Sequence, residues 1–200
     1  MDKARIAVLV SGGGTNLQAL IDAQHNGVLN SGEICLVISN NPSAYALERA
    51  KCAGIESAII TKKDAGSQSA FEQRIMDLLD NKQIDIIILA GFMSILSEGF
   101  TSQYPERILN VHPSLIPSFC GAGFYGLKVH EEALRYGVKV TGATVHFVNE
   151  IPDGGKIILQ KSVAVRKGDT PEILQKRVME QAEWKILPRA VEMVSKKFRK

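Results

Sequence analysis

Short apolar runs alternate with amphipathic stretches through the first half of the chain. The runs are rich in β-branched residues, as strands are, and the stretches between them repeat their apolar positions with a helical period. The expected strands are residues 5–10, 33–39, 57–61 and 84–90, and the expected helices are residues 15–24, 43–53 and 69–81. This alternation predicts an α/β fold with a parallel sheet and crossover helices.

The second half continues with different connections. It adds an expected strand at 107–111, a helix at 127–136 and strands at 140–148 and 157–165. A Pro-Asp-Gly-Gly turn at 152–155 lies between the last two strands, so they are expected to form an antiparallel hairpin in a mixed, mostly parallel sheet. Thr170 and Pro171 supply an N-cap and a first-position proline for a final helix that runs to about Met193.

The bulk composition is that of an ordinary globular protein. The chain has 200 residues, of which 45% are hydrophobic and 22% charged, and no linker or repeat divides it. We therefore expect one domain over residues 1–200, with a phosphate-binding half at about 1–100 and a half at about 101–200 that carries the catalytic residues. The net charge of +3 comes partly from Lys196, Lys197, Arg199 and Lys200, a pattern more typical of a solvated helix end than of a nucleic-acid surface.

The N-terminus and the cysteines bear on location. The apolar run after Arg5 is too short for a signal peptide or a membrane span, so we expect a cytoplasmic protein with no membrane or nucleic-acid partner. Cys35, Cys52 and Cys120 lack metal-ligand spacing and are expected to be reduced thiols, with no metal site. The sequence leaves a homo-oligomer open.

Four unusual segments follow expected strands. In an open parallel sheet, ligands bind beyond the carboxyl ends of the strands, near the point where strand order reverses. The segments at this edge are residues 11–16, 39–42, 91–96 and 110–113. Their expected convergence is stronger evidence for a binding site than any one of them.

The segment Ser11-Gly12-Gly13-Gly14-Thr15-Asn16 joins a strand to a helix. Glycines let backbone N–H groups approach an anion at a helix N-terminus, although a plain tight turn would have the same residues. No Gly-Lys-Ser/Thr ending is present, and Leu17 stands where a dinucleotide fingerprint has its third glycine. A phosphomonoester is therefore the favoured ligand of this loop.

Asn110 and His112 are the favoured catalytic candidates. If the strand runs through Val111, the two side chains point to the same face, and an amide with an imidazole suits a developing oxyanion. Asp153 is by default a turn residue, and only a partner such as His112 would give it a chemical role. His146, which alternates with apolar neighbours, is by itself more typical of a satisfied core histidine.

Several longer segments resemble the glycinamide ribonucleotide (GAR) formyltransferases of purine biosynthesis, over nearly the whole chain. The segments are residues 8–18 (VLVSGGGTNLQ), 38–40 (ISN), 89–97 (LAGFMSILS), 109–117 (LNVHPSLIP), 144–148 (TVHFV), 153–155 (DGG) and 158–160 (ILQ). The resemblance implies a Rossmann-like N-terminal half and the formyltransferase fold. It also implies transfer of a formyl group from 10-formyltetrahydrofolate, as co-substrate, to the amine of GAR, with the folate bound by the catalytic half at about 101–200.

The resemblance assigns roles by position. Asn110, His112 and Asp153 match the family's catalytic trio, and Glu183 matches a glutamate that binds ribose hydroxyls, although without the family it would be an exposed helix carboxylate. The remaining implied contacts are Gly13, Gly14, Thr15 and Asn16 for the GAR phosphate, and Met93, Ser94, Ile95, Leu96, Asn110 and Gln68 for the folate.

Some positions depart from the family pattern. Gln68 stands where a basic residue often meets the folate tail, with Lys62 or Lys63 as substitutes, and Ser94 stands at a common arginine. Trp184 replaces a frequent histidine, and the segment before Glu183 is one residue longer than usual.

Four alternative functions remain at this stage, and one of them, a non-catalytic nucleotide-binding module, would leave Asn110, His112 and Asp153 without a joint purpose. A formyltetrahydrofolate hydrolase usually carries an extra N-terminal domain, for which a first strand at Arg5 leaves no room. A methionyl-tRNA formyltransferase normally adds a C-terminal RNA-binding domain. A nicotinamide-dependent Rossmann dehydrogenase would explain the glycine-rich loop but lacks the other fingerprint residues.

Overall fold

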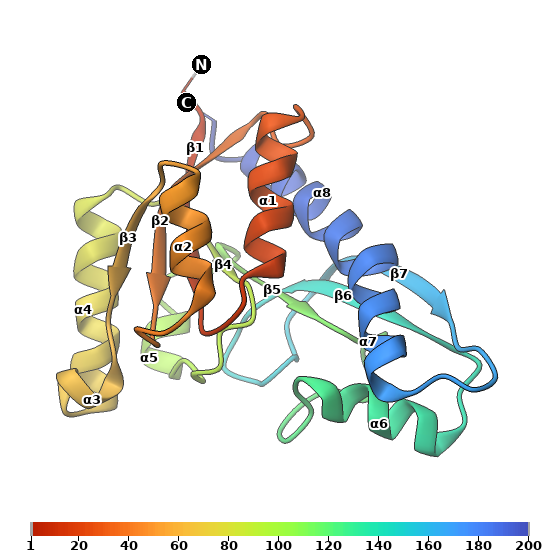
Figure 1. Cartoon of the computed structure of the whole chain (residues 1–200). Coiled ribbons are helices and arrows are strands. Elements are labelled where there is room, and N and C mark those ends of the chain that lie inside the picture. Colours follow the sequence, from red (N-terminus) through yellow and green to blue (C-terminus); the bar gives the residue numbers. More distant parts are fainter. Residues whose placement is uncertain (1, 200) are drawn as a thin grey trace.

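A computed structural model describes residues 2–199, so Met1 and Lys200 lie outside the described residues. One seven-stranded sheet runs through the molecule in the order β3-β2-β1-β4-β5-β6-β7 (Figure 1). Its strands are β1 (Ala4–Val10), β2 (Gly32–Ser39), β3 (Glu56–Ile59), β4 (Ile86–Leu89), β5 (Ile108–His112), β6 (Val140–Phe147) and β7 (Ile157–Ala164). Strand order reverses at β1, which lies between β2 and β4, as it does in doubly wound folds.

The direction of the strands confirms the expected mixed sheet. The first five strands pair in parallel, whereas β6 is antiparallel to both β5 and β7. β6 and β7 therefore form the predicted hairpin. β5 extends one residue further than predicted and ends at His112.

Helices cover both faces of the sheet (Figure 1). They are α1 (Thr15–His25), α2 (Tyr45–Cys52), α3 (Lys62–Ala65), α4 (Gln68–Asn81), α5 (Glu98–Thr101), α6 (Leu127–Tyr136), α7 (Pro171–Val178) and α8 (Trp184–Ser195). The sequence did not predict α3 and α5, because a single turn is too short to show a helical period. Each begins at a side-chain cap, Thr61 for α3 and Ser97 for α5.

Alternating residues of β1 face two separate apolar clusters. Ile6, Val8 and Val10 pack into the cluster that contains α1 and α8, and Ala7 and Leu9 pack into the one that contains α4. Burial on both faces explains why these strands are apolar at nearly every position. The sheet is thus a rigid platform whose carboxyl edge carries the loops.

The last helical segment differs from the prediction. We expected one helix from Thr170 to about Met193, but a π-helix at Met179–Glu183 separates α7 from α8. A π-turn holds one more residue than an α-turn, so the extra residue before Glu183 is accommodated here without breaking the helical path. After α8, Lys196, Lys197 and Arg199 are exposed, as expected of a solvated helix end.

Candidate functional site

Loops from the carboxyl ends of β1, β2 and β4 are tied together by hydrogen bonds. The Met93 backbone N–H donates to Ser11 Oγ at 2.8 Å, and Asn40 Nδ2 donates to Ser94 Oγ at 2.8 Å. Asn41 Nδ2 donates to the Ser11 carbonyl at 3.1 Å. Three of the four segments predicted to converge therefore meet at the edge of the sheet, and one of them follows β1, the strand at which strand order reverses.

The glycine-rich loop leads directly into α1. Gly14 is the N-cap, with φ +70° and no side-chain cap hydrogen bond, and a Cβ there would lie 2.6 Å from that of Ala46. Only glycine fits this close approach in a left-handed conformation. The first N–H groups of a helix have no partner within it, so the turn over Thr15 and Asn16 can bind an anion.

Glu183 lies against the same turn. Its side chain is buried, and Asn16 Nδ2 donates to Glu183 Oε2 at 2.7 Å. Glu183 is therefore not an exposed helix carboxylate, the role that the sequence favoured for it without the family. Burial raises the pKa of Glu183 to about 7, although the Asn16 hydrogen bond acts in the opposite direction.

Asn110, His112 and Asp153 lie together beside this edge. Asn110 and His112 are alternate residues of β5 and share a face, as predicted. Asp153 approaches from the β6–β7 connection, with Oδ2 at 3.4 Å from His112 Nδ1 and Oδ1 at 3.4 Å from Asn110 Nδ2. Its carboxylate also accepts the Gly121 N–H at 2.9 Å, so Asp153 has partners that a plain turn residue would lack.

The charge state of this cluster differs in one respect from the expectation. Burial, the largest cause, and the His146 ring lower the pKa of His112. Asp153 raises that pKa, as expected, and so does the Phe119 carbonyl, but the net pKa lies below its ordinary value. Burial would raise the pKa of Asp153, but the His146 ring, the His112 ring and the Gly121 N–H together hold it below its ordinary value. At neutral pH the site thus contains an ionised carboxylate beside a predominantly neutral imidazole.

His146 belongs to the cluster, which its sequence pattern did not indicate. Its Nε2 lies 3.2 Å from Asn110 Nδ2 and 3.6 Å from Asp153 Oδ1, and its Nδ1 lies 2.7 Å from the Phe147 carbonyl. Because a carbonyl oxygen can only accept, Nδ1 of His146 is the donor in that contact, and Nε2 faces Asn110 and Asp153. The one available signal was the antiparallel pairing of Asn110 with His146, which depends on the sheet register.

A cavity of about 140 Å³ opens next to Asn110 and His146. Its walls combine apolar side chains with amide groups, and include Leu89, Phe92, Val148 and Asn149. Of the residues expected to contact the folate, Ser94, Ile95, Leu96 and Asn110 line it. Residues 149–153 close its other side.

Met93 and Gln68 do not line this cavity. The Met93 side chain is exposed, and its backbone N–H is bound to Ser11. Gln68 Nε2 donates to Glu72 Oε1 at 2.6 Å and to the Ile95 carbonyl at 3.2 Å. Gln68 thus supports the loop that carries Ile95, while Lys62 and Lys63 are exposed on α3.

Known proteins share this arrangement over nearly the whole chain. The model of the formyl transferase family matches residues 4–191. The phosphoribosylglycinamide formyltransferase of Haemophilus influenzae is 43% identical over 184 residues, which are 92% of this chain and 84% of that protein. The chain belongs to the formyl transferase family. The sequence resemblance is thereby confirmed, and the relatives do not support the hydrolase or the dehydrogenase alternative.

Other relatives also resemble this chain over nearly its whole length. The crystal structure of glycinamide ribonucleotide transformylase 1 from Symbiobacterium toebii superposes with a TM-score of 0.91 and 40% identity, covering 98% of this chain and 89% of that one. The human trifunctional purine biosynthetic protein adenosine-3 is 47% identical over 193 residues, 96% of this chain. The chain spans 18% of the length of that trifunctional relative.

The described residues also bear on metal binding and on membrane insertion. Among residues 2–199, no three or more His, Cys, Asp or Glu side chains are placed to hold a metal ion. No helix in the same range is long and apolar enough to cross a membrane.

Glu183 gives a prediction about stability and pH. Because its folded pKa of about 7 exceeds the ordinary 4.5, its neutral form is favoured in the folded protein. Stability is then lost as pH rises from about 4.5 to 7, by roughly 3 kcal/mol at most. We expect Glu183→Gln to be nearly neutral at pH 5 and stabilising by up to about that amount at pH 8, as measured by urea unfolding. Glu180→Gln, at an exposed position of the same π-helix, is the control; equal pH dependence of wild type and Glu183→Gln would contradict the prediction.

Proposed function

We propose that this chain transfers the formyl group of 10-formyltetrahydrofolate to the amine of 5-phosphoribosylglycinamide, giving formyl-GAR and tetrahydrofolate in de novo purine biosynthesis. The observation that carries the proposal is the approach of the Asp153 carboxylate to both Asn110 and His112, within 3.4 Å of each, beside a cavity and a helix N-terminus. We propose one formyltransferase domain over residues 1–200 as its unit.

Both halves of the chain contribute residues to the site of each substrate. The GAR phosphate lies at the N-terminus of α1, bound by the loop of Gly13 and Gly14 and by Thr15 and Asn16. Glu183 accepts hydrogen bonds from the ribose hydroxyls, a role supported by its burial against Asn16. The folate lies in the cavity beside Asn110, held by Ser94, Ile95 and Leu96, whose loop Gln68 supports through the Ile95 carbonyl. Met93 contributes through the backbone of that loop.

The substrate amine is itself the nucleophile. It attacks the formyl carbon, a C–N bond forms, and the carbonyl oxygen becomes an oxyanion. Asn110 donates an N–H to this oxygen, and His112 donates its Nε2–H, which exchanges the Phe119 carbonyl at 2.8 Å for the substrate oxygen. The developing negative charge raises the pKa of His112, so the ring takes up a proton from water. The Asp153 carboxylate stabilises the imidazolium, which returns the proton when the intermediate collapses.

Collapse of the intermediate breaks the bond between the formyl carbon and N10 of the folate. One proton passes from the amine nitrogen to N10, with the Asp153 carboxylate and water as its route. The low pKa of Asp153 suits this step, because a carboxylate must be ionised before it can accept a proton. No protein nucleophile is required.

One assay separates the proposal from its rivals. Purified protein is mixed with 10-formyltetrahydrofolate, and deformylation of the folate is followed with GAR, with initiator methionyl-tRNA, or with water alone. We expect deformylation only with GAR. Deformylation at the same rate in water would instead favour a hydrolase, and dependence on tRNA would favour a tRNA formyltransferase.

A further inference from the structure

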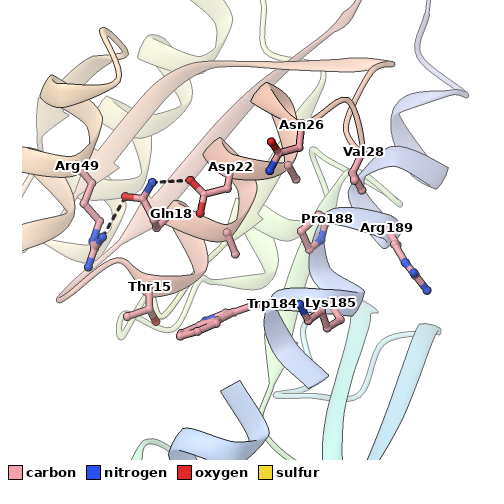
Figure 2. Close-up of a pocket in the computed structure, with 12 residues that line it drawn as sticks. Thr15, Gln18, Asp22, Asn26, Val28, Arg49, Trp184, Lys185, Pro188 and Arg189 are labelled. Atoms are coloured by element: carbon pink, nitrogen blue, oxygen red, sulfur yellow. Dashed lines mark hydrogen bonds between the residues drawn. The ribbon is translucent and has the colours of Figure 1, made fainter. Parts of the chain in front are cut away.

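A groove of about 460 Å³ starts at Thr15 and runs along α1, between α1 and α8. Figure 2 shows Thr15 and Asp22 of α1, with Asn26 directly after that helix, on one side, and Trp184, Pro188 and Arg189 of α8 on the other. Arg49 lies at the Thr15 end, where Arg49 Nη1 donates to Gln18 Oε1 at 3.0 Å (Figure 2). The groove therefore begins at the loop proposed to hold the phosphate.

The indole of Trp184 forms the wall of the groove next to Thr15 (Figure 2). Its Nε1 is a buried atom and has no hydrogen-bond partner among residues 2–199. Indole N–H can only donate, and a buried donor without an acceptor is costly. The neighbouring Thr15 Oγ1 has only a weak contact, with Met179 Sδ at 3.9 Å.

The π-helix accounts for the position of the indole. In a π-turn, residues five apart lie one above the other, so Met179 and Trp184 can both face the same turn of α1. Glu183, one residue earlier, faces Asn16 at the same time. The extra residue of the π-turn thus places the Glu183 carboxylate against Asn16 and the Trp184 indole next to Thr15.

We propose that Trp184 is a substrate-binding residue whose indole N–H donates to an oxygen of the substrate phosphate. The proposal rests on the proposed function and adds a ligand from the C-terminal helix to the loop around Thr15.

Donors surround this position, which favours an anion. The α1 N-terminus, Thr15 Oγ1 and the Arg49 guanidinium lie at the same end of the groove as the indole. Among the described residues that line the groove, Asp22 carries a carboxylate, which accepts from Gln18 Nε2 at 2.9 Å. That carboxylate repels an anion placed deeper in the groove, so the phosphate is held at the Thr15 end.

Trp184 is the single tryptophan of the chain, so its fluorescence reports on this position alone. We expect ribose 5-phosphate to change the intensity or the wavelength of the emission of the wild-type protein, with saturation, whereas ribose at the same concentrations leaves it unchanged. Because ribose 5-phosphate has no glycinamide amine, this measurement needs no catalysis. No change with saturating ribose 5-phosphate, when calorimetry detects its binding, would overturn the proposal.

The variant Trp184→Phe keeps an aromatic ring and removes the donor. We expect its KM for GAR and its Kd for ribose 5-phosphate, measured by calorimetry, to rise about ten- to hundredfold, the usual effect of losing a hydrogen bond to a charged group, while kcat stays within about twofold. Val28→Ala, at the far end of the same groove, should change neither constant.

The outcomes separate this inference from the proposed function. If wild-type protein formylates GAR and Trp184→Phe has unchanged KM and Kd, the inference about Trp184 is wrong and the function stands. If wild-type protein does not use GAR at all, the function fails, and the ribose 5-phosphate titration still tests the indole as a phosphate ligand.

Discussion

Replacing Asn110 by alanine is expected to lower kcat for formyl transfer to GAR by about 10²–10³, the usual effect of removing an oxyanion donor. KM for GAR should change little, because the amide acts on an oxygen whose charge develops only in the transition state. Steady-state kinetics with 10-formyltetrahydrofolate and GAR provides the measurement.

The position of Asn110 makes this substitution a clean test. Its Nδ2 lies 3.2 Å from His146 and 3.4 Å from Asp153, both long for hydrogen bonds, so the amide is free to turn one N–H toward a substrate oxygen. Asn81→Ala, at an exposed amide at the end of α4, controls for the chemistry of the substitution. Turnover near the wild-type value in Asn110→Ala would remove Asn110 from the mechanism.

The framework of this fold could be predicted from the sequence because most of its strands and helices are determined by residues close together along the chain. Ile86–Leu89 is apolar throughout and forms the central strand β4, and Thr170 with Pro171 starts α7 as predicted. The sharing of one face by Asn110 and His112 also followed from local alternation. Such features depend on neighbours within a few residues, which a sequence displays directly.

The contacts between distant segments could not be predicted in the same way. Asp153 is 43 residues from Asn110, and its approach depends on the register of two antiparallel strand pairs. Its juxtaposition with His112 was therefore a hypothesis supported by resemblance. The role of His146 was missed for the same reason, since it is visible only once β5 and β6 are aligned.

The C-terminal helix shows a second reason why part of the structure could not be predicted from the sequence. A continuous helical period predicted one helix, but the packing of Met179 and Glu183 against the start of α1 selects a π-turn. This preference comes from tertiary contacts rather than from helix propensity. Burial of Glu183 follows from the same packing, which explains why the sequence pattern alone favoured an exposed carboxylate.

Asp153 connects the catalytic cluster to the loop that covers it. Its carboxylate meets His112, Asn110 and the Gly121 N–H, and its backbone has φ +56°. Asparagine tolerates this left-handed conformation better than most residues and has nearly the same shape. Asp153→Asn therefore removes the charge and the proton acceptor while leaving the backbone unstrained.

We expect Asp153→Asn to lower kcat by about 10²–10⁴, the range for loss of a general acid–base group. Two effects act together, because the neutral amide neither accepts the amine proton nor stabilises an imidazolium at His112. Single-turnover measurements with GAR should show the loss in the chemical step, whereas Asp77→Asn, on the exposed face of α4, should behave as wild type. If Asn110 and Asp153 act on one transition state, the double variant should lose less than the product of the two single losses. If the kcat of Asp153→Asn lies within tenfold of the wild-type value, the proton travels by another route, and the Asp153 carboxylate serves mainly to hold Gly121 and its loop.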